Sequence, residues 1–335
     1  MCRVFSKSLL FQKRIVTNRR IVFEGIEDAV FQKYLALGAG PDEVLVESFT
    51  TALSPGTEKE YFLDSPNFHQ SRPYIPGYSG CGIIKGVGKN VVGFHKNEIV
   101  AGLLKHVAFN VLAPELLAPV PEGVEPRCAS FVTLGVIALT GIRGADITGG
   151  EKVAVLGQGI LGQLVDQLIR IQGAGSVTAV ALSDTKKSMA EKSGVDEFIA
   201  LAESDCSFPE CNFDVVIDIT GSLKGFESAL KMVKSGGRVV MLGSIPTYAE
   251  ASNWAEIVVE KGIEVKGAHV RNLEAEGLTY KAEVERFLQL LADGKIRVEH
   301  LITDVYKPKD APEIYHRLAD GDRNMVGVVI DWQSA

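Results

Sequence analysis

Cysteine is scarce in this sequence, and its spacing argues against both a disulfide framework and a C-x-x-C motif. The five cysteines are Cys2, Cys81, Cys128, Cys206 and Cys211. An odd and scattered set cannot be paired completely, and no two of these residues have C-x-x-C spacing. We therefore expect the protein to work in a reducing compartment.

Long apolar runs and clusters of basic residues are missing as well. Basic residues interrupt every apolar stretch of residues 1–20, which argues against a secretory signal, and no uncharged run reaches the ~18–20 residues that a membrane helix needs. The formal net charge is −7, and lysine and arginine are spread thinly, whereas a nucleic-acid-binding surface needs a basic stripe. We expect a cytoplasmic protein that binds neither membranes nor nucleic acid.

The chain is long enough for two domains, because it has 335 residues of which 46% are hydrophobic. Its first part reads as short strands and turns, with strands predicted at 43–49, 80–88 and 97–102. From Gly149 onward, strands and helices alternate over about 130 residues, which predicts an α/β fold with a doubly wound parallel sheet. The predicted strands there are 152–156, 177–182, 197–201, 213–220 and 237–243, and the helices are 160–171, 186–193 and 225–233. Helices at 282–292 and 311–318 and a strand at 326–330 follow.

A glycine-rich turn lies between the first strand of this block and its helix. It has the spacing G-x-G-x-x-G: the first glycine makes the turn, the second lets a pyrophosphate approach the backbone, and the third lets the helix pack on the strand. The N-terminus of the helix adds unpaired N–H groups that favour phosphate. We predict a dinucleotide-binding loop; the alternative is a purely structural turn. The predicted cofactor-binding residues of the loop are Gly157, Gly159, Ile160, Leu161 and Gly162.

The acidic residue that would select NAD is missing. It should lie about 20 residues past the motif, where it would hold the ribose 2′-OH, but Ala181 stands there. Ser183 and Lys186 follow and could bind a 2′-phosphate, so we predict NADPH as the cofactor. NAD is the alternative if Asp184 takes the place of the missing acid. The ends of two later strands add the predicted cofactor-binding residues Thr220, Gly221, Gly243 and Ser244.

Three phrases, at 134–143, 150–157 and 234–239, are similar to phrases of the medium-chain dehydrogenase/reductase superfamily, which includes the zinc-type alcohol dehydrogenases. The order of elements resembles this superfamily along nearly the whole chain. The resemblance implies a Rossmann domain (135–271) inserted in a β-rich, GroES-like catalytic domain (1–134 and 272–335). It also implies a homodimer paired through the edge strand at 262–269. The alternative is a monomer whose edge is guarded by Glu264 and Lys266.

The catalytic zinc ligands of this superfamily are replaced. The ligand positions hold Pro55, Tyr78 and, for the third ligand, a residue near Thr133, none of which offers thiolate, imidazole or carboxylate. The structural zinc lobe is also absent, so we predict no bound zinc. In this respect the chain resembles a zinc-less subgroup that contains bacteriochlorophyllide dehydrogenase and dehydrogenases of specialised biosynthesis. The alternative is a rebuilt metal site drawn from Cys81, Glu58, Glu60, His69 or His106.

Without zinc, hydrogen-bond donors must stabilise the charge that develops on the substrate oxygen. The resemblance places Thr57 at the proton-relay hydroxyl, with Glu58 beside it, and the phenol of Tyr78 where a ligand histidine would stand. His106 opens a predicted strand at 106–109 and could act as acid or base near neutral pH. We predict these four residues as catalytic. The alternative is a purely structural role for each of them. Thr57 and Glu58 would satisfy backbone groups in a tight turn, Tyr78 would belong to the core, and His106 would be a strand residue with its hydrogen bonds satisfied.

The predicted function is zinc-independent hydride transfer between NADPH and a ketone or secondary alcohol of a small metabolite or biosynthetic intermediate. A first alternative is the reduction of conjugated C=C bonds, as in enoyl and quinone reductases, which needs only a donor to the oxygen. A second alternative, from another class, is a cofactor-binding protein without turnover, because some relatives serve as lens crystallins.

Overall fold

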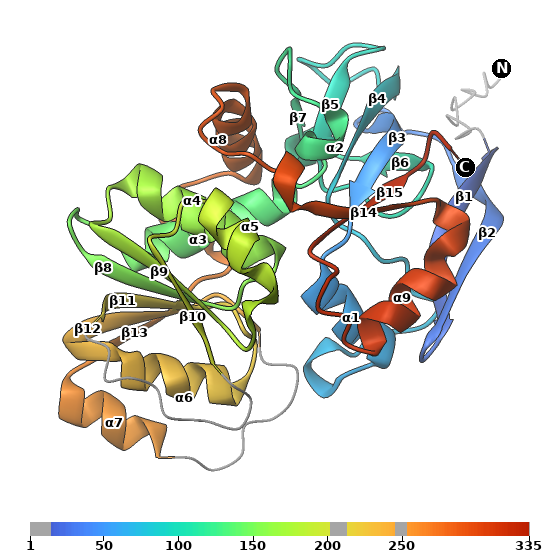
Figure 1. Ribbon diagram of the computed structural model, residues 1–335. Helices are drawn as coiled ribbons and strands as arrows, with labels where there is room; N and C mark the ends of the chain where they lie inside the picture. The colour runs from blue at the N-terminus through green and yellow to red at the C-terminus, as the bar shows by residue number, and fades with distance from the viewer. Residues whose placement is uncertain (1–14, 202–212, 245–252, 335) are drawn as a thin grey trace, which may run out of the picture.

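A computed structural model describes residues 15–201, 213–244 and 253–334 (Figure 1). Three of the five cysteines behind the expectation of a reducing compartment, Cys2, Cys206 and Cys211, lie outside these residues. The other two, Cys81 and Cys128, are buried free thiols. Within the described ranges, no helix combines the length and the apolar character that crossing a bilayer requires.

The first large sheet combines segments from both ends of the chain. The C-terminal strand β15 (Gly327–Asp331) pairs antiparallel with β3 (Val44–Ala52), next to β4 (Gly80–Val87). Along β3, Val44 and Val46 are buried while Leu45 and Glu47 are partly exposed, the alternation expected of a strand with one core-facing side. The order is β14-β15-β3-β4-β5-β7, with β6 on β3. Its other strands are β5 (Ile99–Gly102), β6 (Phe109–Leu112), β7 (Leu117–Pro119) and β14 (Ile302–Tyr306).

The second sheet has six strands in the order β10-β9-β8-β11-β12-β13, all paired in parallel. The strands are β8 (Lys152–Leu156), β9 (Ser176–Ala181), β10 (Glu197–Ala200), β11 (Phe213–Asp218), β12 (Val233–Met241) and β13 (Glu264–Gly267). The strand order reverses direction on either side of β8, so the switch point where such sheets bind ligands lies between β8 and β11.

Helices cover both faces of this parallel sheet (Figure 1). Val153 and Val155 of β8 pack with α3 (Val132–Ala145) and α4 (Ile160–Gln172). Ala154 and Leu156 point to the opposite core, which contains α6 (Leu223–Met232). Because both sides of β8 are buried, its sequence is continuously apolar after Lys152. The remaining helices are α5 (Lys187–Lys192), α7 (Trp254–Lys261), α8 (Tyr280–Ala292), α9 (Ala311–Ala319) and α2 (Pro126–Ala129).

The predicted fold class, a doubly wound parallel sheet inserted in a β-rich part, is therefore confirmed. The exact domain boundaries stay a prediction. The sequence did not indicate the N-terminal pair of strands, β1 (Ile15–Gly25) and β2 (Asp28–Leu37). It also did not indicate the helix α1 (Pro55–Leu63), because the apolar residues of that segment do not recur with a helical period.

The predicted strand at 106–109 is wrong in its position, because β6 begins only at Phe109. At His106 the chain bends so that its backbone and ring lie against Gly77: a Cβ on Gly77 would be 2.6 Å from the His106 nitrogen and 2.7 Å from the ring. Gly77 also has a φ of +89°, which favours glycine. The bend therefore depends on a glycine directly before Tyr78.

Candidate active site

The predicted phosphate loop joins β8 to α4 in a tight glycine turn. Gly157 has a φ of +101°, and a Cβ on Gly162 would lie 2.0 Å from the Gly157 carbonyl oxygen. Nothing lies within 4 Å of the Cβ position of Gly159, and the side of the loop at this residue is therefore open. No side chain caps the N-terminus of α4 at Gly159, so its first N–H groups are left for a phosphate. Ile160 and Leu161 form the first turn of that helix.

The ends of β11 and β12 meet this loop. A Cβ on Gly157 would be 3.4 Å from the Thr220 nitrogen, and a Cβ on Gly243 would be 2.6 Å from the Gly221 nitrogen. A Cβ on Gly221 would in turn be 2.7 Å from the Ser244 carbonyl oxygen. The structure thus brings the predicted cofactor-binding residues of three strands together at the carboxyl edge of the sheet, beside the switch point.

The predicted ribose-binding residues lie at the end of β9 and directly after it. Ala181 is its last residue, and the Ser183 hydroxyl lies 3.0 Å from the Thr185 hydroxyl. Burial lowers the pKa of Lys186, and the nearby guanidinium of Arg323 lowers it further. Two cations that repel one another form a place where an anion is favoured. Arg323 could not be predicted from the sequence, because it comes from the loop before β15, far along the chain.

Four hydroxyl groups gather where the resemblance places the zinc ligands and the proton relay. The phenol of Tyr78 lies 3.5 Å from the hydroxyl of Thr57, a contact at the long end of the hydrogen-bond range. The Thr133 hydroxyl donates to the Tyr78 carbonyl oxygen at 2.7 Å and is 2.7 Å from the phenol of Tyr280. Tyr280 is the first residue of α8 and belongs to no motif, which is why sequence reasoning missed it. We call these four residues the hydroxyl cluster.

Both phenols of the hydroxyl cluster are protonated at neutral pH. Burial raises the pKa of Tyr78 to about 12, although the hydroxyls of Ser54 and Thr57 offset part of that effect. Burial also raises the pKa of Tyr280, and the neighbouring Tyr78 raises it further. Tyr78 and Tyr280 therefore act as neutral hydrogen-bonding groups, and the long contact to Thr57 leaves the Tyr78 proton available to a substrate.

Glu58 and His106 lie deeper than the hydroxyl cluster, as a buried pair. They are 1% and 0% exposed, and the Nε2 of His106 is 3.0 Å from Oε2 of Glu58. The same Oε2 accepts the phenolic proton of Tyr315 at 2.6 Å, and Oε1 accepts the backbone N–H of Ser54 at 2.9 Å. Because Ser54 directly precedes α1, the pair fixes the start of the helix that carries Thr57.

A second hydroxyl lies on the other side of the His106 ring. The indole N–H of Trp332 donates to Thr51 Oγ1 at 2.9 Å, and that hydroxyl lies 2.7 Å from Nδ1 of His106. In the tautomer in which Nδ1 accepts the Thr51 proton, Nε2 carries the proton that faces Glu58. Every polar atom of the pair has a partner. A catalytic role of either residue stays a prediction, and the burial favours a positioning role.

The side chains at the three ligand positions do not match a zinc donor set. Pro55 is the first residue of α1 and offers no donor atom, Tyr78 is a protonated phenol, and the Thr133 hydroxyl is engaged by its two neighbours. Among the described residues, no group of three or more His, Cys, Asp and Glu side chains is placed to hold a metal. In the alternative ligand set, His69 pairs with Asp64 at the surface instead.

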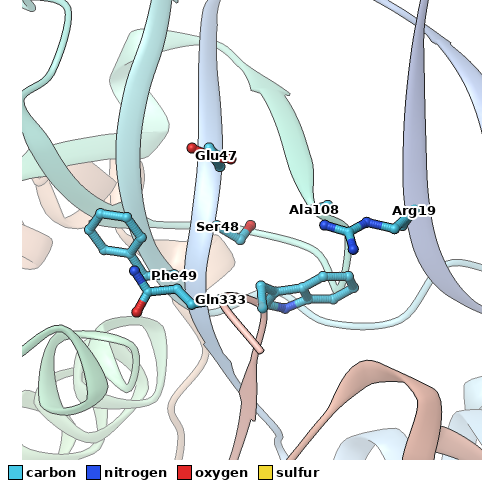
Figure 2. A pocket seen from close by; sticks show the side chains of 7 residues that line it. Arg19, Glu47, Ser48, Phe49, Ala108 and Gln333 are labelled. Carbon is cyan, nitrogen blue, oxygen red and sulfur yellow. The ribbon is translucent and has the colours of Figure 1, made fainter. Parts of the chain in front are cut away.

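A small cavity of about 120 Å³ lies beside β3, apart from the hydroxyl cluster (Figure 2). Figure 2 shows Arg19 of β1, Phe49 of β3 and Gln333 around it. It shares Trp332 with the buried network of His106, but none of the predicted site residues lines it. We therefore do not assign this cavity to the predicted reaction.

Comparisons with known proteins show similarity to dehydrogenases and reductases. The family described as zinc-binding dehydrogenase matches residues 161–293. The 2-methylene-furan-3-one reductase of Solanum lycopersicum is 28% identical over 215 residues, which cover 60% of this chain and 55% of that protein. The L-threonine 3-dehydrogenase of Vibrio cholerae is 24% identical over 298 residues, which cover 78% and 83%. A solved structure described as a zinc-binding dehydrogenase of Sinorhizobium meliloti bound to NADP has a TM-score of 0.81 at 19% identity, covering 95% of this chain and 100% of that one.

The family match spans most of the parallel sheet and α8, and the structural match extends over both sheets. The similarity of sequence and fold to these proteins confirms the predicted resemblance and the prediction of an enzyme. The chain is similar in sequence and fold to the medium-chain dehydrogenases and reductases, and the relatives that it matches are named as dehydrogenases and reductases.

Proposed function

We propose that the protein transfers hydride between NADPH and a ketone or secondary alcohol without zinc. The observation that carries this proposal is the Tyr78 phenol. It stands at a ligand position of the resemblance, burial raises its pKa to about 12, and its contact to Thr57 is 3.5 Å long. A protonated donor that is weakly engaged can polarise a carbonyl group, which is the task a zinc ion would otherwise perform.

Tyr78 and Thr57 have different roles in proton transfer: Tyr78 protonates the substrate oxygen, and Thr57 returns a proton to Tyr78. When bound, the reduced nicotinamide supplies the hydride to the carbonyl carbon. Tyr78 donates a hydrogen bond to the carbonyl oxygen, and this bond strengthens as negative charge develops there. Because an alkoxide is a stronger base than a phenolate, the Tyr78 proton then moves to that oxygen and completes the alcohol. Thr57 passes a solvent proton back to Tyr78, and alcohol oxidation runs through the same groups in reverse.

Two features support NADPH as the cofactor. Ala181 leaves no carboxylate at the end of β9 to repel a 2′-phosphate, and Lys186 lies with Arg323 where such a phosphate would be favoured. The similar structure bound to NADP has the same fold, which makes NADP compatible with this architecture. NAD stays the alternative.

A second candidate is the reduction of a conjugated C=C bond. Its support is the similarity to a 2-methylene-furan-3-one reductase, whose name describes reduction of an unsaturated ketone. In that reaction Tyr78 would donate to the oxygen of an enolate, so the same site would serve. A cofactor-binding protein without turnover is the third candidate, and single-turnover oxidation of NADPH by a substrate would exclude it.

The test is cofactor oxidation by the purified chain with a panel of matched ketones and conjugated enones, using NADPH and NADH in parallel. We expect oxidation of NADPH with ketones to exceed that with enones, and Tyr78→Phe to abolish most of it. Lys307→Ala, a surface change distant in sequence from the site, serves as the control. Activity confined to enones would favour the second candidate, and no activity with either class would favour the third.

We also infer a homodimer that pairs through β13. All four residues of this edge strand are exposed, and its free backbone groups can extend the sheet into a second copy. Light scattering should give twice the 36.1 kDa chain mass, and Val265→Pro should weaken the dimer because proline removes a ladder donor. A monomer at micromolar concentration would contradict this inference. The cytoplasmic location likewise stays a prediction.

A further inference from the structure

The hydroxyl of Thr133 has a hydrogen-bonding pattern that can be assigned completely. A threonine hydroxyl has one proton and two lone pairs. Its oxygen lies 2.7 Å from the carbonyl oxygen of Tyr78, and a carbonyl oxygen can only accept. The Thr133 proton is therefore used in that bond.

This assignment fixes the direction of the neighbouring bond. The Thr133 and Tyr280 oxygens are also 2.7 Å apart, and Thr133 has no second proton to offer. Tyr280 must therefore donate its phenolic proton to Thr133. Burial raises the pKa of Tyr280, so the phenol keeps this proton over the neutral range and does not become a phenolate.

The lone pairs of the Tyr280 oxygen remain. Among the described residues, none is seen to donate a hydrogen bond to this oxygen. Tyr280 is only partly buried, and Tyr78 is near enough to affect its pKa. The hydroxyl cluster thus presents two different groups to a ligand: Tyr78 can donate, and Tyr280 can accept.

We propose that Tyr280 is a specificity-determining residue that accepts a hydrogen bond from an O–H or N–H group next to the reacting carbonyl. The preferred substrates are then ketones with a neighbouring hydroxyl or amino group, or the corresponding alcohols. This assignment rests on the proposed function, since it places the carbonyl oxygen at Tyr78. A ketone that lacks the donor leaves the Tyr280 oxygen without its partner and binds less tightly.

The test is equilibrium binding to the complex of the full chain with oxidised NADP, in which a ketone cannot be reduced. Isothermal titration calorimetry compares 3-hydroxy-2-butanone with 3-methyl-2-butanone, because these ketones differ only by a methyl group in place of the hydroxyl. We expect the hydroxyketone to bind about five- to tenfold more tightly, the size of one ordinary hydrogen bond. In Tyr280→Phe the ratio of the two Kd values should fall to about one.

Tyr306→Phe is the matched control, because it removes a phenolic hydroxyl from β14 and should leave the ratio unchanged. Binding of NADPH to Tyr280→Phe confirms that this variant is folded. Equal Kd values in the unmodified protein, no measurable binding of either ketone, or a preference that survives in Tyr280→Phe would each overturn the assignment. If the preference depends on Tyr280 but no carbonyl compound is reduced with NADPH, the assignment stands and the proposed function fails.

Discussion

Replacing Glu58 by alanine should destabilise the protein strongly, because the carboxylate accepts three buried hydrogen bonds. They come from the His106 ring, the Tyr315 phenol and the backbone N–H of Ser54, at 3.0, 2.6 and 2.9 Å. Alanine leaves all three donors without an acceptor in a region from which water is excluded, since Glu58 is 1% exposed. The variant therefore tests whether Glu58 holds the structure around α1.

The magnitude follows from the three donors. Each unsatisfied buried donor costs about 1–3 kcal/mol, so the upper limit is about 9 kcal/mol. Water entering the vacated space would satisfy part of this set, and breaking a buried pair by removing one partner typically costs about 3–5 kcal/mol. We expect this lower range for Glu58→Ala. For a folding unit of about 150–250 residues, a loss of about 3–5 kcal/mol in the free energy of unfolding corresponds to a decrease in Tm of about 6–20 °C.

The assay is thermal unfolding followed by circular dichroism, with NADPH binding measured on the same samples. Glu60→Ala is the matched control on the same helix, because the Glu60 carboxylate makes its hydrogen bond to Ser65 nearer the surface, and the change should cost about 1 kcal/mol or less. A Tm of Glu58→Ala within about 2 °C of the parent would show that these three hydrogen bonds do not hold the structure around α1. Loss of activity in Glu58→Gln at unchanged Tm would support a catalytic role instead.

Three further predictions concern the donor, the cofactor and a buried acid. Tyr78→Phe should lower kcat about 10²- to 10³-fold, and kcat of the unmodified protein should not titrate with this group below a pKa of about 12; an unchanged kcat in steady-state assays would contradict this. Ala181→Asp should weaken NADPH binding about tenfold or more in fluorescence titrations without weakening NADH, because it sets a carboxylate against the 2′-phosphate, and equal losses would contradict it. Burial raises the pKa of Asp166 in the folded protein well above its usual range. The contribution of this residue to stability is therefore fully present below the pKa that Asp166 has in the unfolded chain, and it is lost as pH rises through the raised pKa. Asp166→Asn should therefore raise Tm at pH 7 but not near pH 4, and an equal gain at both pH values would count against this explanation.

The parallel sheet could be predicted from the sequence because its determinants are local. β8 lies at Lys152–Leu156, as predicted, since a strand buried on both faces is a short, continuous apolar run between turns. α4 begins at Ile160, as predicted, because the glycine spacing of the loop defines its start. These elements require no knowledge of distant contacts.

The hydroxyl cluster could be predicted only in part, because it is assembled from distant segments. Thr57 and Tyr78 followed from the resemblance. The helix α1 was missed because its residue Glu58 is held by tertiary contacts to His106 and Tyr315 rather than by an apolar face. Tyr280 and Arg323 reach the predicted site from the C-terminal part of the chain. No local pattern marks either residue, so three-dimensional structure was needed to find them.

Metal analysis combined with turnover distinguishes hydride transfer without a bound metal from zinc-dependent catalysis. The protein is purified without chelators, its zinc content is measured by mass spectrometry, and NADPH oxidation by a ketone substrate is followed before and after chelation. We expect far less than one zinc per chain and unchanged activity after chelation. One zinc per chain, with activity lost on chelation and restored by zinc, would contradict it and show that residues other than Pro55, Tyr78 and Thr133 hold the metal.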